Sequence, residues 1–130
     1  MEDLISLEII TPLGMIYKGK VKSVVLPGSE GEFGVLKGHS SLVSSLKYGV
    51  IDIEMEDLNH EFIAIDGGHC KVDSDNISIL AKNAVYISGN SDSGIEKSIQ
   101  EAKDLIKSIS SDSITLAATF SKIDNARLTK

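Results

Sequence analysis

The sequence predicts an N-terminal antiparallel β-sandwich, residues 1–87, followed by a C-terminal antiparallel hairpin of two helices, residues 88–130. Short apolar runs separated by turn residues fill the first region at the spacing of about 8–12 residues that is typical of sandwiches. Apolar residues in the second region recur at the helical steps of three and four. The charge excess lies entirely in the first region, which has 13 acidic and 7 basic side chains.

Five apolar runs give the clearest strands of the eight to ten that we expect. They are Leu4 to Ile10, Val21 to Leu26, Val50 to Met55, Phe62 to Ile65 and Ile77 to Leu80. From Ile51 and Asp52 onward, apolar and acidic residues alternate, which places one face in a core and the other in water. Lys18, Lys20 and Lys22 also alternate, as expected of an edge strand that charge protects from pairing.

Two turn-rich stretches have alternative readings as ligand loops. Gly28 to Gly34 holds three glycines at steps of three, but Glu30 and Glu32 would repel a phosphate and the Gly-Lys-Ser/Thr ending is missing. We therefore predict a tight, exposed acidic β-turn there. Asp73 to Asn76 begins like a calcium loop without its later glycine and glutamate, so we predict a hairpin turn.

The second region begins after a polar linker, Asn90 to Gly94, and contains two amphipathic helices joined by a serine-rich turn, Ser110 to Ser113. The helical stripe consists of Ile95, Ile99, Ala102, Ile106 and Ile109, and it resumes with Leu116, Phe120 and Ile123. Because its alanines bury little area, the hairpin must lean on the sandwich or on a partner, and it could detach.

Composition excludes several classes of function. The net charge of −6 and a pI near 5.0 repel phosphate backbones, and Arg127 is the only arginine, so nucleic acid is excluded as a partner. The single cysteine, Cys70, supplies neither an internal disulfide nor a zinc cluster. The apolar runs are too short to span a bilayer and the N-terminus is acidic, so we expect a soluble protein without direct membrane insertion.

The candidate chemical groups indicate no enzyme. His39, His60 and His69 match no metal-ligand spacing, and Cys70 lacks an identifiable activating base. We therefore predict no catalytic residue, no metal and no cofactor. The residues alone indicate an acidic binding or coupling module. The alternatives are a free-standing sandwich adaptor that binds an extended peptide at its edge, and a small hydrolase that would depend on His39 or His69.

The order of several blocks resembles the epsilon subunit of bacterial F-type ATP synthase. The most specific block runs from Val25 to Leu42, and Gly67 to Val72 and Ile79 to Ala84 follow the family's later blocks in order and spacing. The resemblance covers effectively the full chain. Lys37 replaces the family's usual proline before Gly-His, and His69 replaces a usual apolar residue after Gly-Gly.

This resemblance implies a non-catalytic rotor subunit of the central stalk, on the cytoplasmic face of the bacterial inner membrane. The family's sandwich binds the gamma subunit with one face and rests with one end on the c ring, and it couples the two in proton-driven ATP synthesis. Carried over by position, Glu30, Gly31, Glu32 and His39 belong to the end that meets the c ring.

The predicted helical hairpin resembles the family's mobile inhibitory element, which restrains ATP hydrolysis. The regulatory residues so assigned are Ile95, Ile99, Ile106, Lys122 and Arg127. Lys122 and Arg127 give the second helix a weakly basic end that could contact the catalytic beta subunits. Family members that bind ATP carry an arginine where this chain has Ile99, so the resemblance implies no ATP site and leaves Arg127 as a weak candidate.

Overall fold

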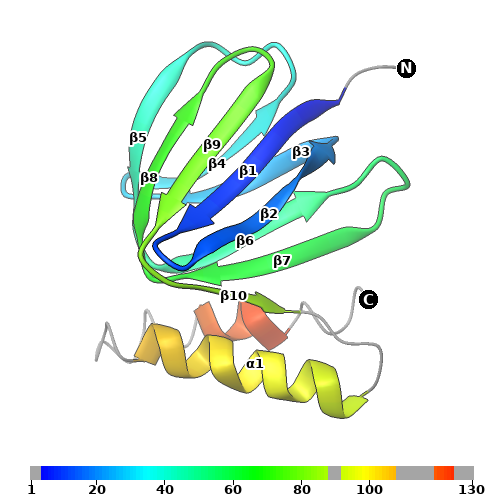
Figure 1. Cartoon of the computed structure of the whole chain (residues 1–130), viewed down its shortest axis with the longest axis vertical. Coiled ribbons are helices and arrows are strands. Elements are labelled where there is room, and N and C mark those ends of the chain that lie inside the picture. The colour runs from blue at the N-terminus through cyan, green and yellow to red at the C-terminus, as the bar shows by residue number, and fades with distance from the viewer. Residues whose placement is uncertain (1–3, 88–91, 108–118, 125–130) are drawn as a thin grey trace.

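The computed structural model describes residues 4–87, 92–107 and 119–124. The elements are β1 (Ile5–Thr11), β2 (Gly14–Val21), β3 (Ser23–Gly28), β4 (Gly31–Leu36), β5 (Leu42–Leu46), β6 (Gly49–Glu54), β7 (His60–Ile65), β8 (Gly68–Val72), β9 (Asn76–Ala81), β10 (Ala84–Ile87) and α1 (Asp92–Lys107). Residues 119–124 are also helical and run antiparallel to α1 (Figure 1). The predicted strands followed by two helices are confirmed.

The strands form one sheet in the order β10-β7-β6-β3-β5-β8-β9-β1-β2, with β4 paired to β3. Every pair is antiparallel except β1 with β9, which are parallel from Ser6 opposite Asn76 to Ile10 opposite Leu80. The sequence predicted an antiparallel sandwich and gave no indication of this one parallel pair. A parallel pair needs a long crossover, and nearly the whole sandwich connects these two strands in the chain.

The sheet folds over itself into two layers that enclose the main core (Figure 1). β3 joins the layers, because its first residues pair with β6 whereas Gly28 pairs with Leu46 of β5. The largest fully buried side chains of this core are Ile5, Leu7, Ile9, Leu26, Ile51, Ile53, Ile63, Ile65, Ile77 and Ile79. The alternation predicted around Ile51 is therefore confirmed.

The predicted edge strand is also confirmed. β2 ends the strand order, and its Lys18 and Lys20 are exposed, while Lys22 follows the strand.

At the predicted hairpin turn between β8 and β9, the Asp73 carboxylate accepts hydrogen bonds from the backbone N–H groups of Asp75 and Asn76, both at 2.9 Å. These two hydrogen bonds lower the pKa of Asp73.

The helices cover the side of the β7 and β10 layer that points away from the main core (Figure 1). A second apolar cluster lies between them, made of Val50, Phe62, Ala64, Ile87, Ile99, Ala102, Ile106 and Ile123. The predicted stripe is confirmed for its described side chains, and those of Ile95, Ile109 and Leu116 lie outside the described residues. The hairpin does lean on the sandwich, as its narrow seam predicted.

The start of the first helix differs from the prediction. α1 begins at Asp92, so the second half of the predicted linker is helical. Aspartate and serine are favoured in the first turn of a helix, where acidic and hydroxyl side chains interact well with free amide groups, and their polarity alone does not mark a linker. The predicted serine-rich turn, Ser110 to Ser113, lies outside the described residues.

Candidate functional site

The turn between β3 and β4 is an acidic tip with a geometry that requires glycine. Gly28 pairs with Gly31, leaving Ser29 and Glu30 as the two turn residues, and Glu30 is exposed. Gly31 has φ +127°, and a Cβ on Gly28 would meet the Gly31 carbonyl oxygen at 2.7 Å and the Phe33 ring at 2.8 Å. The predicted tight, exposed acidic turn is confirmed at Ser29 and Glu30, whereas Gly31 to Gly34, which the prediction included, belong to β4.

Backbone hydrogen bonds hold this tip against the neighbouring strand β5. The Ser29 N–H donates to the carbonyl oxygen of Ser45 at 3.0 Å, and the Lys47 N–H donates to that of Pro27 at 2.9 Å. These two hydrogen bonds, one on each side of Gly28, fix the direction of the turn relative to the sandwich. The carboxylates of the tip therefore project from a rigid support.

His39 lies away from the tip. It follows the far end of β4, where its N–H donates to the Leu36 carbonyl oxygen at 3.1 Å and the Gly38 N–H donates to that of Ser74 at 2.8 Å. The six residues of β4 separate it from Glu30, roughly 20 Å along the strand. The structure thus brings Glu30, Gly31 and Glu32 together, and the four predicted residues do not form one cluster.

The C-terminal helical segment reaches the tip through an ion pair. Lys122 pairs with Glu32 of β4, and each side chain is 46% exposed. Partial burial lowers the pKa of Lys122. Beside the pair lies a cavity of about 170 Å³ between segment and sandwich, lined in part by Pro27, Tyr48 and Thr119. Sequence reasoning named both Glu32 and Lys122 but gave no reason to pair them.

A second set of contacts joins the two helical segments to each other. The Lys103 ammonium of α1 lies 2.9 Å from the Asp124 carboxylate and 5.5 Å from the centre of the Phe120 ring. Ile99, 3% exposed, packs with fully buried Ile123 in the helix-covered cluster. The position where ATP-binding relatives would carry arginine therefore faces the sandwich. Arg127 lies outside the described residues.

The layer formed by β5, β8, β9, β1 and β2 presents the other broad surface, which we call the outer face. One of its rows, set by strand register, runs from Leu80 of β9 through Ile10 of β1 to Met15 of β2. Leu80 is 57% exposed and Met15 49%, and Val43 of β5 is 74% exposed. This face carries apolar side chains that no described part of the chain covers.

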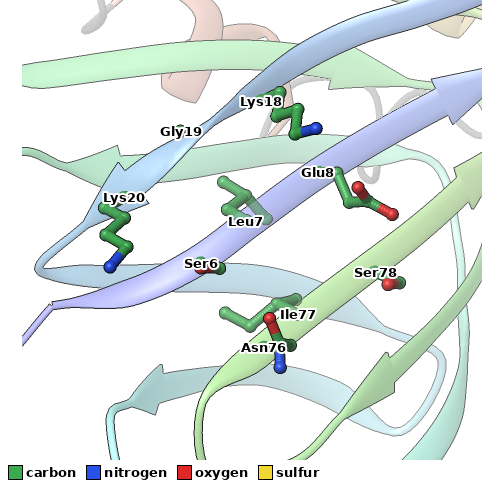
Figure 2. A pocket seen from close by; sticks show the side chains of 9 residues that line it. All are labelled: Ser6, Leu7, Glu8, Lys18, Gly19, Lys20, Asn76, Ile77 and Ser78. Carbon is green, nitrogen blue, oxygen red and sulfur yellow. The ribbon is translucent and has the colours of Figure 1, made fainter.

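A second row of the outer face is polar and basic. Lys71, Ser78, Glu8 and Lys18 are successive partners across β8, β9, β1 and β2. Figure 2 shows Lys18, Lys20 and Glu8 on this face, where they line a shallow hollow of about 350 Å³. Three lysines against one glutamate make this part of the surface positive, although the chain as a whole has a net charge of −6.

The remaining candidate groups are dispersed. His60 Nδ1 lies 2.6 Å from the Asp52 carboxylate, and its ring stacks on Phe62 at 6.0 Å between centroids. His69 is exposed and Cys70 is 2% exposed on the opposite face, as predicted. Burial raises the pKa of the Cys70 thiol, and a backbone hydrogen bond from Ser44 partly offsets this.

The described residues hold neither a cluster suited to a metal ion nor a membrane-spanning helix. Among residues 4–87, 92–107 and 119–124, no three His, Cys, Asp or Glu side chains gather closely enough to hold a metal ion. In the same ranges, no helix is long and apolar enough to cross a membrane.

A ten-stranded β-sandwich with an acidic tip, followed by helices docked on one of its layers, defines by its fold the class of protein to which the chain belongs. The model of a family described as "ATP synthase, Delta/Epsilon chain, beta-sandwich domain" matches residues 4–87. The ATP synthase epsilon chain of Campylobacter jejuni subsp. doylei is 71% identical over 128 residues, 98% of this chain and 99% of the relative. The chain belongs to the family of ATP synthase epsilon chains, and the resemblance is confirmed.

Other comparisons agree. The ATP synthase epsilon chain of Campylobacter lari is 70% identical over 125 residues, 96% of each chain. A chain in the Euglena gracilis mitochondrial ATP synthase, solved as OSCP/F1/c-ring, has a TM-score of 0.63 and 26% identity, covering 97% of this chain and 76% of that one. A chain from the Tetrahymena thermophila mitochondrial ATP synthase, solved as central stalk and c-ring, has a TM-score of 0.53 and 15% identity, covering 80% of this chain and 94% of that one. This is a likeness of fold alone.

Proposed function

We propose that the chain is a non-catalytic rotor subunit of the central stalk, which couples a gamma shaft to a c ring in proton-driven ATP synthesis. Family membership supports this proposal, together with structural neighbours solved within F1 and c-ring assemblies. The observation that carries it is the rigid acidic tip at one end of the sandwich. Such a subunit would be peripheral to the membrane, held there by the ring.

The proposed ring contact consists of Glu30, Gly31 and Glu32. Two carboxylates on a turn of fixed direction suit a polar, partly basic loop surface, because complementary charge sets orientation and speeds association. His39 lies at the other end of β4 and would not share this contact. We therefore assign the ring-facing end to the tip alone.

The proposed gamma contact is the outer face. α1 covers the opposite layer, whereas Leu80, Met15 and Val43 remain exposed here beside basic Lys71 and Lys18. Burial of these apolar side chains would supply affinity, and the lysines would select an acidic surface. A gamma surface with apolar residues flanked by carboxylates would match both the apolar row and the basic row of the outer face.

A binding experiment tests the gamma contact directly. We expect Leu80→Asp to weaken capture of the full-length chain by immobilised gamma at least ten-fold. Leu58→Asp is the matched control, because Leu58 is 60% exposed in the turn between β6 and β7, at φ 71°, a conformation that aspartate tolerates. Equal effects of the two variants would refute the outer face as the gamma contact. A wild-type chain that does not bind gamma would favour the peptide-binding adaptor.

The C-terminal helices are proposed to restrain ATP hydrolysis by leaving the sandwich. The small contact that Ile99, Ala102, Ile106 and Ile123 make with the sandwich supports this, since low-energy contacts open readily. A bis-maleimide crosslink between Glu32→Cys and Lys122→Cys would hold the segment down. We expect the crosslinked complex to hydrolyse ATP faster than the same complex before crosslinking, and unchanged hydrolysis would refute the restraint.

A further inference from the structure

Glu32 belongs to the acidic tip, yet its carboxylate already has a cationic partner from the same chain. The turn holds Glu32 at the start of β4, immediately after Gly31. Lys122 approaches it from the helical segment 119–124, which lies against the sandwich in Figure 1. The tip and the C-terminal segment thus meet at a single carboxylate.

The position of Lys122 depends on the docking of its segment. The next residue, Ile123, is fully buried in the helix-covered cluster, and Thr119, one turn earlier, is 9% exposed. If the segment leaves the sandwich, these anchors go with it and Lys122 leaves Glu32. If the segment stays, Glu32 is already neutralised and offers less negative charge to an incoming cation.

We propose that Glu32 is a shared site, at which a Lys or Arg side chain of the docking partner and Lys122 of the chain itself exclude each other. Partner binding at the tip would then favour release of segment 119–124, and a docked segment would weaken partner binding. The proposal rests on the proposed function, in which the partner is a basic loop of the c ring.

The expected size of the coupling follows from the exposure of the pair. Both side chains are about half exposed, and an ion pair of this kind shifts an equilibrium by about two- to five-fold. Linkage is reciprocal, so the factor by which the segment weakens partner binding equals the factor by which the partner loosens the segment. The coupling would shift the balance between the docked and the released segment, and it would not hold the segment in either position.

Affinity of the full-length chain for detergent-solubilised c ring separates this proposal from a merely structural ion pair. Glu32→Gln should weaken binding, whereas Lys122→Gln should strengthen it by about two- to five-fold because it frees the carboxylate. The double variant should bind like Glu32→Gln. Lys107→Gln, an exposed lysine in the last turn of α1, removes the same charge and should leave affinity unchanged.

Amide hydrogen exchange gives the reciprocal measurement. Saturating c ring should speed exchange in residues 119–124 of the wild-type chain by the same factor, and should have no such effect in Lys122→Gln. The shared site is overturned if both variants weaken binding, if Lys107→Gln matches Lys122→Gln, or if bound ring leaves exchange unaltered. A wild-type chain that does not bind the ring refutes the proposed function, and the shared site with it.

Discussion

The rings of Tyr17 and Tyr86 lie 6.4 Å apart at an angle of 46°, and they join the two strands at opposite ends of the sheet. Tyr17 belongs to β2 and Tyr86 to β10, so their contact closes the sandwich without any backbone pairing between those strands. The Tyr17 hydroxyl also points to the Met55 sulfur at 3.5 Å. The layers thus owe part of their closure to one aromatic pair.

Removing the Tyr17 ring should loosen this closure. We expect Tyr17→Ala to lower the free energy of unfolding by about 2 kcal/mol, because the ring is partly buried and an aromatic contact is lost. Tyr17→Phe keeps the ring and should cost less than about 1 kcal/mol. Urea denaturation measures both, and similar losses in the two variants would contradict a role for the ring.

The Tyr17 hydroxyl should also make stability fall in alkaline solution. Burial, and then the negative charge of Glu61, raise the pKa of Tyr17 above its usual value. The folded protein therefore holds this proton more tightly than the unfolded chain does. The resulting stabilisation is complete below the unfolded pKa of about 10 and is lost as the pH rises through the folded pKa.

Comparison with Tyr17→Phe isolates this contribution. The difference in unfolding free energy between wild type and the variant should be constant between neutral pH and about pH 9, and should shrink above about pH 10. Absorbance at the phenolate band should show one tyrosine that ionises later than in the unfolded chain. A difference that does not vary with pH would contradict the raised pKa.

The buried thiol of Cys70 should react only through unfolding. It is 2% exposed, and burial raises its pKa, so little thiolate is available to a disulfide reagent. We expect labelling in native buffer to be at least a hundred-fold slower than in urea. The control is His69→Cys in a Cys70→Ala background, whose thiol lies on the exposed face of β8 and should react at once.

Sequence patterns predicted those strands, helices and turns that are determined by residues close together in the chain. The alternation around Ile51 gave the two-faced strand β6, and the steps of the stripe placed Ile99 and Ile106 on the buried face of α1. Each of these depends only on neighbours within a few residues in the chain. The acidic turn followed likewise from its own glycines and carboxylates.

Features that depend on distant residues were not predicted. Glu32 and Lys122 are 90 positions apart in the chain, and no periodicity relates a strand residue to a helix residue across that separation. The parallel pairing of β1 with β9 depends on topology in the same way. His39 is only nine positions from Glu30, and it lies at the far end of β4 because Gly31–Leu36 form a strand that the predicted turn did not anticipate. Similar residue types in a short stretch do not establish a common surface when a strand separates them.

The two glycines of the tip should respond differently to substitution. Gly28→Ala places a Cβ 2.7 Å from the Gly31 carbonyl oxygen, a backbone atom that cannot move aside alone, so we expect a loss of about 1–3 kcal/mol in unfolding free energy. Gly31→Ala meets open space but keeps φ +127°, so its cost of about 1–2 kcal/mol is backbone strain.

Gly34→Ala is the matched control, because its nearest neighbour would be the Val24 carbonyl oxygen at 3.9 Å and its φ is unexceptional. We expect it to change the free energy of unfolding by less than about 0.5 kcal/mol. If the tip is the ring contact, Gly28→Ala and Gly31→Ala should also weaken c-ring binding at temperatures where both remain folded, since they redirect the carboxylates. Loss of stability with unchanged ring affinity would separate the fold of the tip from its proposed role.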